Sequence, residues 1–154
     1  MAADEGPLTW TADGARFTLT GAFTEKADFA GLLQQIPENA VLDVSGIQHI
    51  NSTGVRAWTQ FVAKLEQKGA KVVLERCSVM FMAQVNMIAR FAGGFPVKSF
   101  LARFACGTCD AWEDVLVDAG PGARAALEGT RPCSKCGGTV ELDDLVDSYA
   151  SFMR

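Results

Sequence analysis

The fold is decided by residues 41–69, which read VLDVSGIQHINSTGVRAWTQFVAKLEQKG. The stretch opens with a short apolar run rich in β-branched residues, which is typical of a strand. Its second half places apolar side chains at helical intervals on one face: Val55, Trp58, Phe61, Val62 and Leu65. Gly69 is a typical helix stop, and a second strand-like run follows at residues 71–74. Strand, helix and strand together predict a parallel crossover.

The turn between this strand and helix carries two hydroxyl side chains, Ser52 and Thr53, directly after Asn51. The first backbone N–H groups of a helix have no partner within the helix, and its N-terminus is electrically positive. Ser52 or Thr53 is therefore predicted to cap the helix, which is what local chemistry favours. A phosphate on either hydroxyl would also be stabilised there, and the two roles are compatible.

The flanking segments predict an α/β fold in which helices pack against a mixed sheet. Strands are expected at residues 8–10 and 16–23, joined by a turn at Asp13-Gly14, and a helix at residues 29–36 should end at Pro37. A helix at residues 78–92 and a last strand of the sheet at residues 97–104 complete the order. The 78–92 helix is apolar on more than one face. Either the C-terminal part covers it, or it is a methionine-rich docking surface for a partner.

This order and the Asn51-Ser52-Thr53-Gly54 turn resemble the STAS family, the sulfate-transporter and anti-sigma-factor-antagonist domain, over roughly residues 7–105. In the bacterial anti-sigma-factor antagonists of that family, the turn reads Asp-Ser-Ser-Gly or Asp-Ser-Thr-Gly. A partner kinase phosphorylates its first hydroxyl. Ser52 matches that serine, with Thr53 as the second choice, and Asn51 stands where the motif has Asp.

The resemblance implies a non-enzymatic bacterial signalling adaptor. Its partner would be a serine kinase that acts as an anti-sigma factor, or another regulator. The expected partner-binding residues are Asn51, Ser52, Thr53, Gly54 and Arg56. The alternative is a constitutive scaffold subunit of a transporter ATPase or another assembly, in which the turn is not phosphorylated.

Four of the five cysteines form two CxxC pairs, Cys106 with Cys109 and Cys133 with Cys136. Each pair can present two thiolates from one tight turn, and four thiolates complete a tetrahedral Zn²⁺ site with no open position. The prediction is one structural zinc ion; an iron–sulfur cluster and disulfides are the alternatives. Cys77 is expected to be a small core residue.

The chain is predicted to divide into a STAS-like domain, residues 1–105, and a zinc-ribbon-like segment, residues 106–154. The second part has four basic and nine acidic residues, and ends in an amphipathic helix that should pack back on the main domain. Its apolar side would comprise Leu142, Leu145, Val146, Tyr149 and Met153. A third hypothesis makes this acidic part the recognition element for a basic protein, through Asp143, Asp144 and Asp147 on the outer side of that helix.

Composition excludes several other classes. No apolar run reaches the ~18 residues of a membrane span, and the acidic N-terminus differs from a basic secretion signal, so the chain is expected to be cytoplasmic. An acidic surface repels phosphate backbones, which argues against nucleic acid. The single histidine, His49, is placed in the loop before Ser52, and Asp43 in mid-strand with its side chain toward a polar edge. No catalytic arrangement with His49 emerges. The sequence leaves the oligomeric state open.

Overall fold

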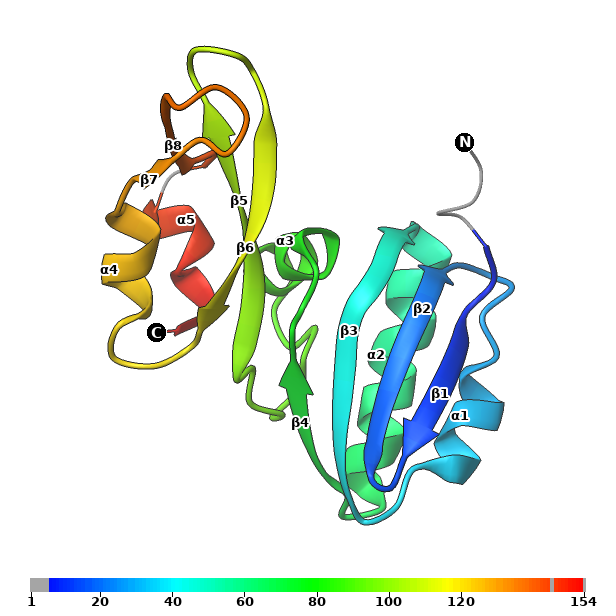
Figure 1. Ribbon diagram of the computed structural model, residues 1–154. Helices are drawn as coiled ribbons and strands as arrows, with labels where there is room; N and C mark the ends of the chain where they lie inside the picture. The colour runs from blue at the N-terminus through cyan, green and yellow to red at the C-terminus, as the bar shows by residue number, and fades with distance from the viewer. Residues whose placement is uncertain (1–5, 145, 154) are drawn as a thin grey trace.

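The computed structural model describes residues 6–144 and 146–153 (Figure 1). Its elements, in chain order, are β1 (Thr9–Asp13), β2 (Arg16–Phe23), α1 (Phe29–Gln35), β3 (Asn39–Ile50), α2 (Ser52–Gln67), β4 (Lys71–Glu75), α3 (Val79–Met87), β5 (Ser99–Cys106), β6 (Trp112–Asp118), α4 (Ala123–Glu128), β7 (Arg131–Pro132), β8 (Thr139–Leu142), α5 (Val146–Tyr149) and the 3₁₀ helix η2 (Ser151–Met153).

The first sheet has the strand order β1-β2-β3-β4, and α1 and α2 cover one of its faces (Figure 1). Strand β3 is parallel to both β2 and β4, and β1 forms an antiparallel hairpin with β2. The predicted crossover through α2 is therefore confirmed. The hairpin turn lies at Gly14 and Ala15, one residue later than expected, with Gly14 in the left-handed conformation that glycine tolerates (φ 62°).

The core of this sheet is a cluster of aromatic rings around Trp58, which is fully buried on α2. Its indole lies parallel to Phe23 of β2, with ring centroids 5.0 Å apart, and meets Phe81 of α3 edge to face at 5.4 Å. The indole N–H donates to the carbonyl oxygen of Phe91 at 2.9 Å. Because these rings come from β2, α2 and α3, one packed cluster fixes the N-terminal half of α2 against the sheet.

Strand β5 does not complete the first sheet, which corrects the expectation for residues 97–104. It forms part of a second sheet with the order β6-β5-β8-β7. Two isolated parallel bridges, Leu74↔Val97 and Cys77↔Phe100, link the chain at the end of β4 to the chain at the start of β5. The reason is that β6 and β8 both pair antiparallel with β5. The predicted boundary after residue 105 falls within β5, and buried apolar residues of both sheets form one continuous cluster.

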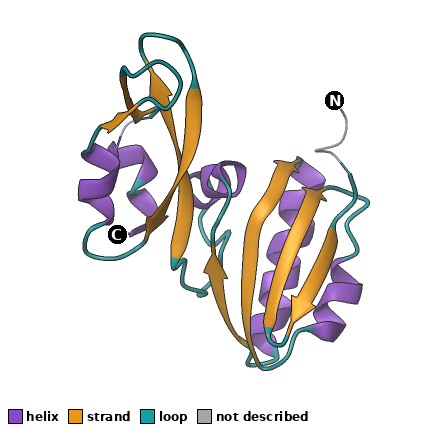
Figure 2. Ribbon diagram, viewed as in Figure 1, coloured by secondary structure: helices purple, strands orange, loops and turns teal. Residues whose placement is uncertain are grey.

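Helix α3 lies between the two sheets and is shorter than expected (Figures 1 and 2). It ends at Met87 because Ile88 is extended, and Arg90 and Gly93 then take left-handed conformations. Phe81 and Met82 are buried, whereas Met80 and Met87 are 37% and 71% exposed. The C-terminal part therefore covers α3 in part and leaves two methionines accessible.

The closing segment is a short helix, α5, followed by η2; Leu145, part of the predicted helix, lies outside the described residues. The predicted helix was too long, because Leu142 ends β8, and Asp143 and Asp144 lie in a bend before α5. The Tyr149 ring packs against Phe100, and the Tyr149 hydroxyl donates to the carbonyl oxygen of Leu101. The side-chain oxygen of Asn86 on α3 accepts from the Ser151 hydroxyl at 2.9 Å and from the Phe152 N–H at 3.1 Å. The prediction that this segment packs back on the main domain is confirmed.

Candidate functional site

Asn51 is the N-cap of α2, so the expectation that Ser52 or Thr53 caps the helix was wrong. The Asn51 side-chain oxygen accepts the Gly54 N–H at 2.8 Å, and the Asn51 backbone is extended (φ −100°, ψ 177°). Asparagine is as good a cap as serine, and here it stands one residue earlier. Ser52 and Thr53 thus occupy the first turn of the helix, and both are exposed.

The turn lies against the end of β2. The Asn51 N–H donates to the carbonyl oxygen of Phe23 at 3.1 Å. Gly54 is buried, and a Cβ atom at this position would overlap the same carbonyl. The glycine is therefore required for α2 to approach β2 so closely. Of the residues predicted to bind a partner, Ser52, Thr53 and Arg56 are exposed, Asn51 is half-buried and Gly54 is covered.

Glu25, in the loop after β2, adds a negative charge to this turn. The Asn51 side-chain NH₂ donates to the Glu25 carboxylate at 3.1 Å. The backbone N–H of Glu25 and this amide hold the pKa of Glu25 below its usual value. Asn51 thus serves both as a cap and as a donor to Glu25, which an aspartate could not do. No sequence pattern indicates this pair, because its members are 26 residues apart. His49, expected in a loop, is a residue of β3.

The four predicted metal ligands come together at one end of the second sheet. Their sulfur atoms all lie within 4.8 Å of one another, with Cys106 and Cys136 3.6 Å apart and Cys109 and Cys133 3.8 Å apart. A tetrahedron with zinc–sulfur bonds of about 2.3 Å has edges of about 3.8 Å. The donor set therefore fits a tetrahedral thiolate site, and all five cysteines are free thiols.

The two cysteine turns have the same construction. In the first, the N–H of Asp110 donates to the carbonyl oxygen of Cys106 at 3.1 Å, and Asp110 is left-handed (φ 61°). In the second, the N–H of Gly137 donates to the carbonyl oxygen of Cys133 at 3.1 Å, and Gly137 is left-handed (φ 76°). Cys106 and Cys133 are buried, and Cys109 and Cys136 are exposed.

Backbone N–H groups in these turns favour thiolates, the form that binds metals. The N–H groups of Cys109 and Thr108 lower the pKa of Cys106 to about 6. Those of Lys135 and Cys136 lower the pKa of Cys133. The Gly138 N–H acts in the same direction on Cys136, but the neighbouring Cys109 and Cys106 sulfurs outweigh it and raise the pKa of Cys136 to about 12. A bound cation would allow all four to be thiolates together.

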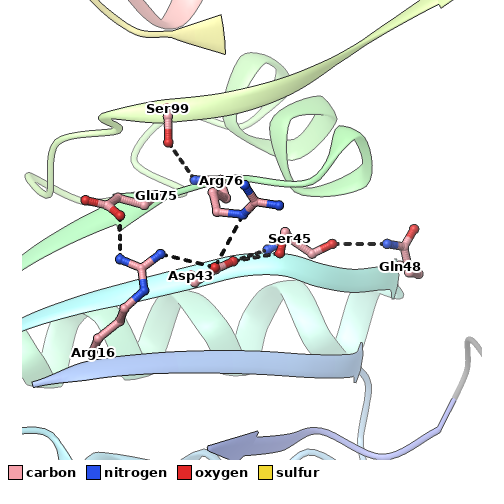
Figure 3. Close-up of polar contacts among 7 residues, drawn as sticks. All are labelled: Arg16, Asp43, Ser45, Gln48, Glu75, Arg76 and Ser99. Carbon is pink, nitrogen blue, oxygen red and sulfur yellow. Dashed lines mark hydrogen bonds and ion pairs between the residues drawn. The ribbon is translucent and has the colours of Figure 1, made fainter. Parts of the chain in front are cut away.

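Asp43 is buried at the junction of the two sheets, which corrects its expected place at a polar edge (Figure 3). Its carboxylate lies 3.2 Å from the Arg16 guanidinium and 3.5 Å from that of Arg76, and accepts from the Ser45 N–H and hydroxyl. Arg76 has φ 52°, and its N–H donates to the Ser99 hydroxyl of β5. The cluster therefore joins β2, β3 and β5.

A family model described as the STAS domain matches residues 8–90, which is just over half of the chain. The chain belongs to the STAS family. Comparison with curated proteins and with solved structures gave no significant match. STAS domains generally act as binding and regulatory domains, and the β3–α2 turn lies within the matched residues, whereas the four cysteines lie beyond them.

Within the residues that the structure describes, no helix has both the length and the apolar character that crossing a membrane requires. The contacts described above define one candidate surface on the STAS domain, the turn from Asn51 to Gly54 with Glu25 and Arg56. The C-terminal segment contributes a candidate metal centre.

Proposed function

We propose that this STAS protein is a non-enzymatic bacterial signalling adaptor, of the kind that antagonises anti-sigma factors, and that it binds a partner through the turn at Asn51–Gly54 and Arg56. The observation that supports this most is the capping role of Asn51. Because Asn51 satisfies the Gly54 N–H, the hydroxyls of Ser52 and Thr53 are exposed at the positive end of a helix of 16 residues.

In this proposal Ser52 is the phosphoacceptor, with Thr53 as the second choice, and the phosphate releases the partner. A phosphate adds about 1.5–2 negative charges at neutral pH. Glu25 already brings a carboxylate to this turn through Asn51. Concentrated negative charge must lose water when a partner docks, and it repels any acidic group of that partner. The natural partner would be a serine kinase or another regulator.

The second part of the proposal is a single structural zinc ion held by Cys106, Cys109, Cys133 and Cys136. The sulfur separations of 3.6 and 3.8 Å support it, since they match the edges of a zinc–thiolate tetrahedron. Four thiolates leave no open coordination position for a substrate. The metal would therefore stabilise the folded turns and take no part in a reaction. Thiolate ligands persist in a reducing compartment, which is consistent with a cytoplasmic protein.

The test of the switch uses the full-length protein and two substitutions at one position. Affinity capture from the source cells with the wild type, Ser52→Ala and Ser52→Asp should recover the same serine kinase or regulator with the first two. The aspartate variant should recover at least about tenfold less, which corresponds to roughly 1.4 kcal/mol. Equal recovery by all three proteins would refute the switch.

A constitutive scaffold is the second candidate, and the exposed Met80 and Met87 on α3 favour it. Methionines adapt to varied contacts, and a scaffold would need a contact surface that does not depend on phosphate. Capture of a transporter ATPase in place of a kinase, with no loss for Ser52→Asp, would select this candidate.

A further inference from the structure

Strand β6 is an edge of the second sheet and is unusually regular for one. Among the described strands it pairs with β5 alone. The pairing runs without interruption from Ala105↔Trp112 to Ser99↔Asp118, with no bulge, and the strand contains neither proline nor glycine. Exposed edges present unpaired N–H and C=O groups, and proteins usually interrupt them with such devices. The β6 edge is therefore geometrically ready to receive another strand.

One face of β6 alternates apolar and acidic side chains: Trp112, Asp114, Leu116 and Asp118. Trp112 is 57% exposed and Leu116 is 46% exposed. The Arg103 guanidinium from β5 lies over the Trp112 ring, 3.8 Å from its centroid, and also donates to Asp114 at 2.9 Å. Arg103 therefore holds both side chains in place before any partner arrives.

The strand lies in a strongly acidic part of the chain. Residues 104–123 contain no lysine or arginine, and they include four acids: Asp110, Glu113, Asp114 and Asp118. Arg103 offsets Asp114, which leaves the net charge beside this edge negative. An edge that carries one sign of charge repels strands of that sign and attracts strands of the other.

A cleft of about 630 Å³ continues this face toward the first sheet. Leu116 and Asp118 line one part of it, and Glu75 and Arg76 line another. A chain that pairs with β6 could thus extend a side chain into the cleft at the junction of the sheets.

We propose that β6 accepts an extended basic segment of a protein partner as an additional strand. Apolar side chains of the segment would pack on Trp112 and Leu116, and a lysine or arginine on the same face would lie opposite Asp118. Glu113 offers a further carboxylate on the other face of the strand. Backbone hydrogen bonds supply affinity in this mode, and the alternating side chains supply specificity. A second copy of this chain fits less well, because two acidic strands would then lie side by side.

This surface differs from the acidic group Asp143, Asp144 and Asp147, which the sequence placed on one helix face and of which only Asp147 lies on α5. There, Asp147 is bonded to Arg124, and α5 offers no strand edge. The surface is also separate in the fold from the β3–α2 turn, so the protein would have two independent contact sites.

The test uses a fluorescein-labelled heptapeptide added to the full-length zinc-loaded protein. Its first, third, fifth and seventh residues are valine, lysine, valine and lysine, and its other residues are threonine, so that both kinds of side chain lie on one face. We expect saturable binding by fluorescence anisotropy, together with slower amide hydrogen exchange confined to residues 112–118. The same peptide with alternate backbone nitrogens methylated keeps its charge but cannot pair, and should bind at least about tenfold more weakly. Equal binding of both peptides would reduce the effect to charge attraction and overturn the proposal.

Two variants and a matched control localise the effect. Leu116→Ala and Asp118→Asn remove exposed side chains and should each weaken peptide binding about fivefold. Glu141→Gln removes the same charge from β8, which has a neighbour on each side, and should change binding less than about twofold. Dimerisation of the free protein through residues 112–118, detected by sedimentation and hydrogen exchange, would show that a second copy occupies the edge and would also overturn the proposal.

Discussion

The β3–α2 turn and the two cysteine turns both display reactive side chains on short backbone turns, but different forces hold them. The first rests on the core: Trp58 is fully buried one turn further along α2, and Gly54 lies directly against Phe23. The second has half of its sulfurs exposed, and one of its strands, β7, is only two residues long. Burial of apolar area therefore forms the first turn before any ligand binds, whereas we expect the second turn to depend on the proposed zinc ion.

Removal of the metal should give the largest effect and separate the two regions. Chelation should remove folding free energy on the order of 10 kcal/mol from the cysteine turns and should unfold this end of the second sheet. Hydrogen exchange should then rise at residues 106–111 and 131–140 and stay slow in α2. Equal protection in the metal-free and zinc-loaded proteins would contradict the account.

Cys109→Ser and Cys77→Ala form the matched pair for this experiment. Cys109 belongs to the sulfur cluster, whereas Cys77 is fully buried away from it. We expect Cys109→Ser to lose zinc at low micromolar metal. Cys77→Ala should keep one zinc per chain and lose only about 1–2 kcal/mol of stability through lost packing.

Trp58→Ala should produce the opposite pattern, damaging the STAS domain first. Loss of the ring cluster should lower the free energy of unfolding by about 3–5 kcal/mol, as measured by urea denaturation. Trp58→Phe keeps a ring but loses the hydrogen bond to Phe91, and should cost about 1–3 kcal/mol. Because the sulfur cluster does not touch Trp58, Trp58→Phe should still bind one zinc. A Trp58→Ala protein as stable as the wild type would refute the packing argument.

Asp43 tests how firmly the two sheets are joined. Asp43→Ala leaves Arg16 and Arg76 without their shared carboxylate, and Ser45 without an acceptor. Both arginines are partly exposed, so water compensates in part and the loss should be about 2 kcal/mol. We expect hydrogen exchange to rise at residues 75–77 and 99–101. Asp43→Asn keeps the Ser45 contact and should lose less; equal losses would show that the arginine pairs contribute little.

The smallest effect is expected at Asn51. Asn51→Ala removes the cap and should cost about 1 kcal/mol. Asn51→Asp keeps the cap and gains from the helix dipole, but it places a carboxylate against Glu25. Glu25→Gln should therefore stabilise the Asn51→Asp protein more than it stabilises the wild type. A double-mutant cycle by urea denaturation measures this coupling, and additive effects would show that the Glu25 contact does not matter.

The sequence predicted features that depend on local spacing and missed those that depend on long-range contacts. The crossover through α2 followed from helical periodicity, and the convergence of the four cysteines from their paired spacing. The cap was assigned one residue too late, because Asn51, Ser52 and Thr53 are all good capping types. Strand β5 was assigned to the wrong sheet, because β6 and β8, its partners, follow it in the chain. Glu25 and Asp43 gain their roles only through residues distant in sequence.

Intact-protein mass spectrometry on material from the source cells, native and then denaturing with fragmentation, tests the account most directly because it reads both regions at once. The account predicts one zinc per chain, lost on denaturation, and a phosphate on Ser52 in a fraction of the molecules. A chain without bound metal, or one whose only phosphate lies outside the turn at Asn51–Gly54 under every growth condition, would contradict it.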